Sequence, residues 1–141
     1  MLLAACVCAA AGCDEKLSDV AGPTPNLTST FSSIQRDIFN APDSTGRPAC
    51  TSCHNAQSFR LNGNLNLSGS GAYAQLVSAT SSAKPTATRV VAGNPDESYL
   101  IQKVEGLPGL VGQRMPLNGP YLTAGQIAII RRWIELGAQN N

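Results

Sequence analysis

The chain has 141 residues, of which 43% are hydrophobic, 13% charged and 5% aromatic. This length favours one domain, but so few aromatic residues are sparse for a chain that builds its whole core alone. Ten lysine and arginine residues nearly balance nine aspartate and glutamate residues, and they do not cluster, so nothing in the charge pattern indicates binding to nucleic acid.

Residues 1–13 form an uncharged run of small and apolar residues that ends in a cysteine. Such a run is too short to cross a bilayer and is typical of an export signal. The segment Ala10-Ala11-Gly12-Cys13 resembles a bacterial lipoprotein processing site, where the thiol is acylated. Cys6, after Leu3-Ala4-Ala5, is an alternative site, and an ordinary cleaved signal is a third interpretation. We predict a protein on the periplasmic side of a bacterial membrane, lipid-anchored at Cys13 or soluble.

Residues 14–29 contain two prolines, with serine and threonine residues, and no apolar period, which predicts a flexible or extended tether. The functional domain is expected over residues 30–141. Its first element is a predicted amphipathic helix over about 30–40, which Pro42 ends. The apolar residues at helical spacing in this helix are Phe31, Ile34, Ile38 and Phe39.

Three further helices are expected. A short one lies near residues 72–79. The segment Asn94-Pro95-Asp96-Glu97 combines a cap, a first-turn proline and two acids, which predicts a helix start there and an end at about Glu105, before Gly106. Thr123 and Gln126 match a capping box for the last helix, which carries Trp133. No strand pattern competes, so the predicted fold class is all-α.

Between the first two helices lies the motif Cys50-Thr51-Ser52-Cys53-His54, which is the CxxCH pattern of covalent haem c attachment. Residues three apart share a face of a helical turn, so both thiols can reach the two vinyl groups of one porphyrin. His54 then lies next to the iron as an axial ligand. A large buried cofactor would also complete the sparse core.

Other interpretations of the motif lack partners in the sequence. A structural zinc site needs about four nitrogen or sulfur ligands, whereas Cys50, Cys53 and His54 are the only such residues outside the leader. A thioredoxin-like dithiol would follow a strand, and here a helix and a proline-containing loop precede the motif.

Met115 is the only methionine besides Met1, and it lies in the glycine-rich segment GLPGLVGQRMP. Pro116 biases Met115 to an extended conformation, so the loop can present the thioether at a fixed point. We predict that Met115 is the second axial ligand; the alternative is that it only packs on the haem. A Met/His pair raises the potential relative to two histidines and leaves no open site.

The order of helix, CxxCH, loops, methionine and a final helix with Trp133 resembles the class I cytochromes c. The segments Val91 to Leu100, Arg114-Met115-Pro116 and Trp133 to Ala138 are similar to the planctomycete-type cytochrome c domain. The resemblance implies a class I cytochrome c-like fold around one covalent haem c, iron ligation by His54 and Met115, and packing of the first helix against the last.

Arg114, next to the predicted ligand, is the preferred partner for a haem propionate, with Arg60 and Arg47 as alternatives, because a guanidinium matches a carboxylate. Many class I members orient the axial histidine with a proline carbonyl soon after the motif, but the first later proline here is Pro85.

The expected function is periplasmic single-electron transfer with transient redox partner proteins, without enzymatic activity. The alternative is a haem-based sensor or small-ligand binder in which Met115 is displaced. A peroxidase would need a distal acid or base, and His54 is the only histidine.

Overall fold

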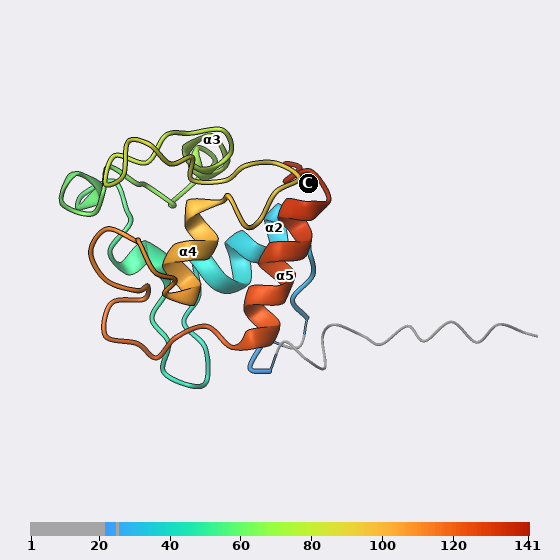
Figure 1. Cartoon of the computed structure of the whole chain (residues 1–141). Coiled ribbons are helices and arrows are strands. Elements are labelled where there is room, and N and C mark those ends of the chain that lie inside the picture. The colour runs from blue at the N-terminus through green and yellow to red at the C-terminus, as the bar shows by residue number, and fades with distance from the viewer. Residues whose placement is uncertain (1–21, 25) are drawn as a thin grey trace, which may run out of the picture.

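A computed structural model describes residues 22–24 and 26–141 of the chain. The predicted export signal, with Cys6 and Cys13, and most of the predicted tether lie outside the described residues. Within them the regular elements are helices, and strand-like pairing is limited to isolated bridges such as that between Val77 and Val90. In the numbering of Figure 1 the α-helices are α2 (Phe31–Ile34), α3 (Ala72–Leu76), α4 (Tyr99–Glu105) and α5 (Ala124–Glu135).

The predicted first helix is confirmed, although its geometry changes along its length. Helix α2 begins after Thr30, whose side chain accepts a hydrogen bond from the Ser33 amide, and it continues as a π-helical segment, η1 (Gln35–Phe39). Two short 3₁₀ turns follow, η2 (Cys50–Ser52) and η3 (Phe59–Leu61).

Helix α4 begins at Tyr99, so the expected start at Asn94 was wrong. Asn94 instead organises a turn, because its side-chain oxygen accepts a hydrogen bond from the Glu97 amide at 3.3 Å. The Ser98 hydroxyl accepts from the Val91 amide at 2.9 Å and donates to the Asn94 carbonyl at 2.9 Å. These contacts hold the segment before Tyr99 in a turn. The predicted end at Gly106 is confirmed, with the glycine in the left-handed region at φ 77°.

The capping box of the last helix is confirmed. The Thr123 hydroxyl accepts from the Gln126 amide at 3.2 Å, and the Gln126 side chain accepts from the Thr123 amide at 2.9 Å. Helix α3 ends at Leu76, earlier than expected, because Val77 turns extended and pairs with Val90.

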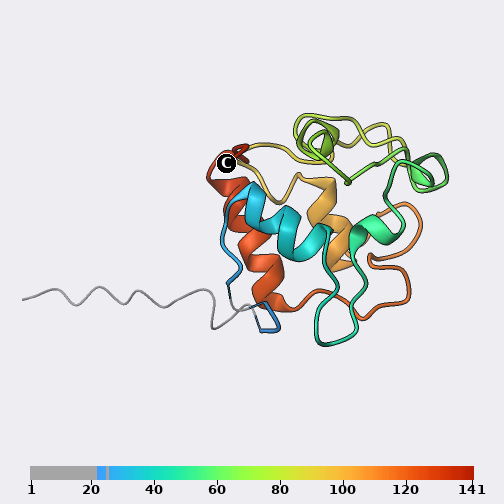
Figure 2. The same ribbon diagram turned by 180° about the vertical axis from the view of Figure 1, so that it is seen from behind.

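The predicted packing between the first and last helices is confirmed. The ring centroids of Phe31 and Trp133 lie 5.6 Å apart, and Tyr73 of α3 meets Phe31 edge-on at 5.2 Å. Figures 1 and 2, which view the molecule from opposite sides, both show α2 and η1 crossing α5 and running toward α4, which lies beside α5. The three helices form the wall from which the long loops extend.

Candidate functional site

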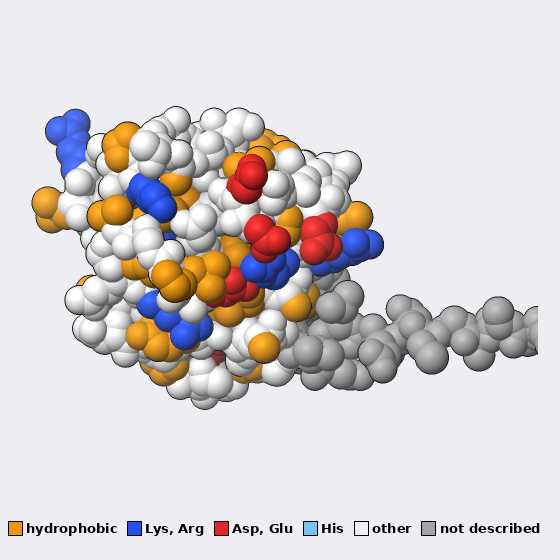
Figure 3. Space-filling view, in the orientation of Figure 1, with side chains coloured by type: hydrophobic (Ala, Val, Ile, Leu, Met, Phe, Trp, Pro, Cys, Tyr) orange, Lys and Arg blue, Asp and Glu red, His pale blue; other side chains and the backbone are white. Residues whose placement is uncertain are grey.

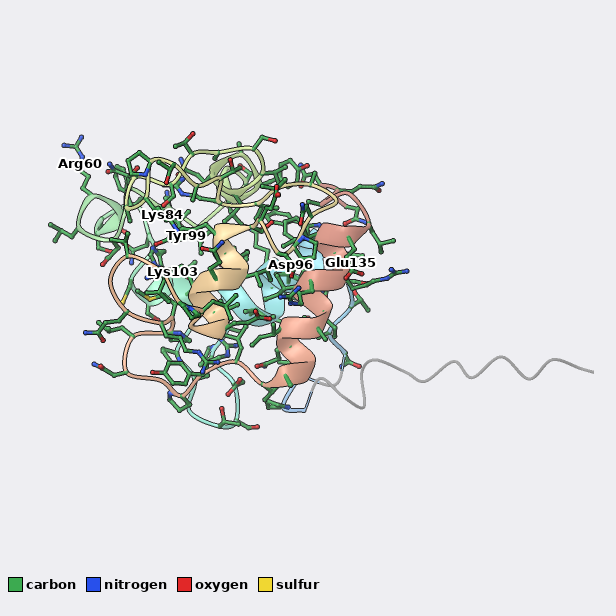
Figure 4. The ribbon with its side chains drawn as sticks, in the orientation of Figure 1. Arg60, Lys84, Asp96, Tyr99, Lys103 and Glu135 are labelled. Atoms are coloured by element: carbon green, nitrogen blue, oxygen red, sulfur yellow. The ribbon has the colours of Figure 1, made fainter. Side chains whose placement is uncertain are left out.

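A cavity of about 340 Å³ lies between the helices and the loops that connect them. Most of its lining is apolar, and it includes Ile38 and Phe39 from η1, Leu76 from α3 and Tyr99 and Val104 from α4. Pockets of about 300–1,000 Å³ with mostly apolar walls are the usual sites of small molecules and cofactors. The labelled side chains of Tyr99 and Lys103 mark the α4 side of this region in Figure 4.

Cys50 lines the cavity from the start of the η2 turn. The amides of Cys53 and His54 both donate to the Cys50 carbonyl, at 3.2 and 2.9 Å. The Thr51 hydroxyl donates to the Phe39 carbonyl at 3.0 Å and ties the turn to the end of η1. The CxxCH motif is therefore a compact turn anchored on the first helix.

The two cysteines have different surroundings. Cys50 is partly buried, and burial raises the pKa of its thiol to about 11. Cys53 is exposed and does not line the cavity. Both thiols are free, so the structure brings Cys50 to the cavity wall and leaves Cys53 on the surface of the same turn.

His54 lines the cavity beside Cys50. Its carbonyl accepts from the Leu67 amide at 2.9 Å. Burial lowers the pKa of the imidazole. The nearby backbone of Leu65 and Asn62 acts to raise this pKa, although neither residue forms a hydrogen bond of normal geometry with the ring. The buried Nδ1 has no hydrogen-bond partner in the described part of the chain. A neutral imidazole in a cavity wall, with a ring nitrogen that has no hydrogen-bond partner, is suited to binding a metal in that cavity.

Met115 reaches the same cavity from the loop between α4 and α5. Its amide donates to the Lys103 carbonyl at 2.8 Å, which ties this point of the loop to α4. The Lys103 ammonium donates to the Val111 carbonyl at 3.1 Å and also to the Gln113 carbonyl. The peptide bond between Met115 and Pro116 is cis.

The three arginines considered as propionate partners do not line this cavity. Arg114 donates from Nε to the Val104 carbonyl at 2.8 Å, and its guanidinium lies 4.0 Å from the centroid of the Tyr121 ring. Arg60 points away from the molecule in Figure 4. Arg47 is fully buried and pairs with Asp43 at 2.9 Å.

Arg89 and Lys103 are the charged side chains of the cavity lining, and the sequence analysis missed both. Neither belongs to a chemical motif. The sequence feature that could have indicated Arg89 is its position directly before Val90 and Val91. A charged residue next to two apolar β-branched residues tends to be partly buried itself. Burial lowers the pKa of both Arg89 and Lys103.

Within residues 22–24 and 26–141, no group of three or more His, Cys, Asp or Glu side chains gathers as a metal site. No helix in that part of the chain is both long and apolar enough to cross a membrane. Comparison with protein-family models, curated proteins and solved structures gives no match.

Proposed function

We propose that the chain is a mono-haem c-type cytochrome that transfers single electrons in the periplasm. In this proposal Cys50 and Cys53 attach the haem, and His54 and Met115 ligate its iron. The observation that carries the proposal is that Cys50, His54 and Met115 line one cavity. His54 and Met115 are far apart in the sequence, and few patterns other than haem ligation would bring an attachment motif and a lone methionine to one apolar cavity.

When bound, the haem supplies an iron that gains or loses one electron. The residues of the chain provide its surroundings. The His54 imidazole, held neutral by burial, offers a nitrogen lone pair, and the Met115 thioether offers a sulfur. The apolar lining excludes water, which keeps the reorganisation on electron transfer small. Because His54 and Met115 would together hold the iron, no position would be left for a substrate, which supports a carrier rather than an enzyme.

The exposure of Cys53 also agrees with attachment at the cavity rim. The turn at residues 50–54 is closed by its own backbone hydrogen bonds and tied to the end of η1 through the Thr51 hydroxyl, so Cys50 and Cys53 lie on one fixed turn that would hold a single haem. Location at the membrane through Cys13 and encounter with transient redox partners belong to the same proposal, and they depend on residues outside the described part of the chain.

The attachment is tested on protein produced with a c-type haem maturation system. The intact mass should exceed that of the processed chain by one haem, and the haem should remain after acidified organic extraction, because thioether bonds are covalent. Cys50→Ala and Cys53→Ala should each keep one thioether and shift the alkaline pyridine spectrum to that of a singly attached haem. Ser52→Ala, in the same turn, serves as the control and should keep the wild-type spectrum.

Extraction of all haem from the wild-type protein would contradict covalent attachment. A wild-type spectrum in both cysteine variants would contradict the assignment of these two thiols.

A further inference from the structure

Arg89 is a buried arginine without a carboxylate partner among the described residues. The residue is 8% exposed, and the ion pairs of this part of the chain involve other arginines. Nη1 donates to the Gln75 carbonyl at 2.8 Å. Nη2 donates to the carbonyls of Gly63 and Asn64 at 2.9 and 3.1 Å. Of the five N–H donors of a guanidinium, Nε–H and one on Nη1 therefore have no hydrogen-bond partner in the described protein.

The wall of the cavity carries positive charge without negative charge. Arg89 and Lys103 line it, and no aspartate or glutamate of the described residues does. Cations beside an apolar cavity cost free energy unless an anion compensates them. The charge of the wall thus matches a ligand that carries carboxylates.

We propose that Arg89 pairs with a propionate carboxylate of the haem and positions it, with Lys103 as a second cation on the same wall. This inference rests on the proposed function and adds to it the residue that binds the polar edge of the cofactor. A haem has two propionates and the wall has two cations. Arg114, the arginine that the sequence favoured, is engaged by Val104 and Tyr121 instead.

The inference is tested on the haem-loaded protein with Arg89→Gln, Arg89→Lys and, as a control, Arg60→Gln, which removes an arginine that does not line the cavity. Loss of a positive charge beside the haem favours the ferric state. Arg89→Gln should lower the equilibrium constant for reduction on the order of tenfold, which is a fall of about 59 mV for one electron. Arg89→Lys keeps the charge and should remain near wild type, and Arg60→Gln should be unchanged.

The second measurement is the propionate bending band in the resonance Raman spectrum, which responds to the group bonded to the carboxylate. The band should shift in both Arg89 variants and stay in place in Arg60→Gln. An unshifted band in Arg89→Lys would overturn the inference, and this holds even if Arg89→Gln does not fold. Equal potentials in Arg89→Gln and wild type would overturn it as well.

Haem content by intact mass is measured first for every variant. Wild-type protein without covalent haem would contradict the proposed function itself. Covalent haem with no effect of Arg89 on the potential or the band would contradict only the pairing.

Discussion

Asp43 and Arg47 form an ion pair in which the carboxylate side chain is 1% exposed and the guanidinium side chain 0%. The Arg47 guanidinium also donates to the carbonyls of Ile38, Pro48 and Ala41, at 3.1, 2.9 and 3.0 Å. It therefore closes the end of η1 and fixes the loop that leads to the CxxCH motif. A buried pair of this kind stabilises a fold only while both partners remain charged and bonded.

Asp43→Asn should lower the free energy of unfolding by about 3–5 kcal/mol, because it leaves the buried Arg47 without a counter-charge. Glu135→Gln is the matched control. Glu135 pairs with Arg132 at 3.4 Å, with side chains that are 46% and 53% exposed, and its loss should cost less than about 1 kcal/mol. Chemical denaturation followed by circular dichroism measures both. Equal effects would show that the buried pair contributes no more than a surface pair.

The same carboxylate makes stability depend on pH. Burial acts to raise the pKa of Asp43, but hydrogen bonds from Thr45, Gln126 and Arg47 outweigh it and hold the pKa well below its usual range. Since the folded pKa is lower than the unfolded value of about 3.9, the contribution is complete above that pH and is lost as the pH falls below about 4. The difference in unfolding midpoint between wild type and Asp43→Asn should narrow over that acidic range. A constant difference would contradict this pKa shift.

Met115 separates an electron carrier from a sensor. If the proposed ligation holds, Met115→Ala should remove the weak far-red absorption of thioether-ligated ferric haem, lower the reduction potential and open the iron to carbon monoxide, because it would delete one ligand of the iron. Leu117→Ala is the control, since Leu117 is 52% exposed and lies outside the cavity lining. If the wild-type ferrous protein itself binds carbon monoxide readily at neutral pH, the sixth position is labile and the sensor interpretation is favoured.

The CxxCH motif and the lone methionine were sufficient to predict that Cys50, His54 and Met115 lie together, and the structure brings all three to one cavity. The sequence did not point to Arg89, which lines the same cavity and which we propose as a propionate partner. A propionate partner depends on where a guanidinium lies in the folded chain. Its number of residues from the CxxCH motif is not fixed, so the sequence alone does not identify it. Nearness in sequence to Met115 favoured Arg114, whereas the fold directs that side chain to Val104 and Tyr121.

Local signals were reliable for helix elements when nothing competed with them. The capping box at Thr123 and the stop at Gly106 are local and were found as predicted. The start signal at Asn94 failed because Ser98 offers its hydroxyl to the same segment and closes a turn first. The early end of α3 could not be predicted from the residues around it, because it depends on the pairing of Val77 with Val90.

Gly106 ends α4 and also accommodates the arginine that precedes Met115. Its φ is 77°, and a Cβ atom there would lie 2.7 Å from Cδ of Arg114. Gly106→Ala should therefore lower the free energy of unfolding by about 1–2 kcal/mol for the left-handed backbone alone, with a further loss from displacing Arg114.

Gly71→Ala is the control for that substitution. Gly71 has φ −79° and no atom within 4 Å of the added methyl group, so the change should be neutral or stabilise by about 0.4–1 kcal/mol. Thermal unfolding of both variants checks the contrast. A Gly106 variant as stable as the Gly71 variant would contradict the strain argument.

At the scale of the whole molecule, the face that Figure 3 shows carries its charges unevenly. On the face in Figure 3, the acidic side chains gather over α4 and α5, where Arg131 pairs with Asp96 and Glu105, each at 2.7 Å. Lys84 and Lys103, labelled in Figure 4, lie on the other side of this face without an ion-pair partner among the described residues. The side with the cavity is thus the more positive one.

The size of the cavity leads to a prediction for how the chain folds without the haem. Without a haem, the mostly apolar wall of this cavity of about 340 Å³ is exposed to water, and each exposed apolar area costs free energy. The whole stability of a domain is about 5–15 kcal/mol. The chain should therefore fold cooperatively only when the cavity is filled.

The test compares the holoprotein with Cys50→Ala, Cys53→Ala double-variant protein produced without haem, using near-ultraviolet circular dichroism and thermal unfolding. Phe31 of α2 and Trp133 of α5 pack together with ring centroids 5.6 Å apart, so the Trp133 signal reports whether these two helices still pack. We expect a weak near-ultraviolet signal and a broad transition in the haem-free chain. A sharp transition within a few degrees of the holoprotein would mean that the helices close the cavity by themselves, and that the haem fills a site which the protein has already formed.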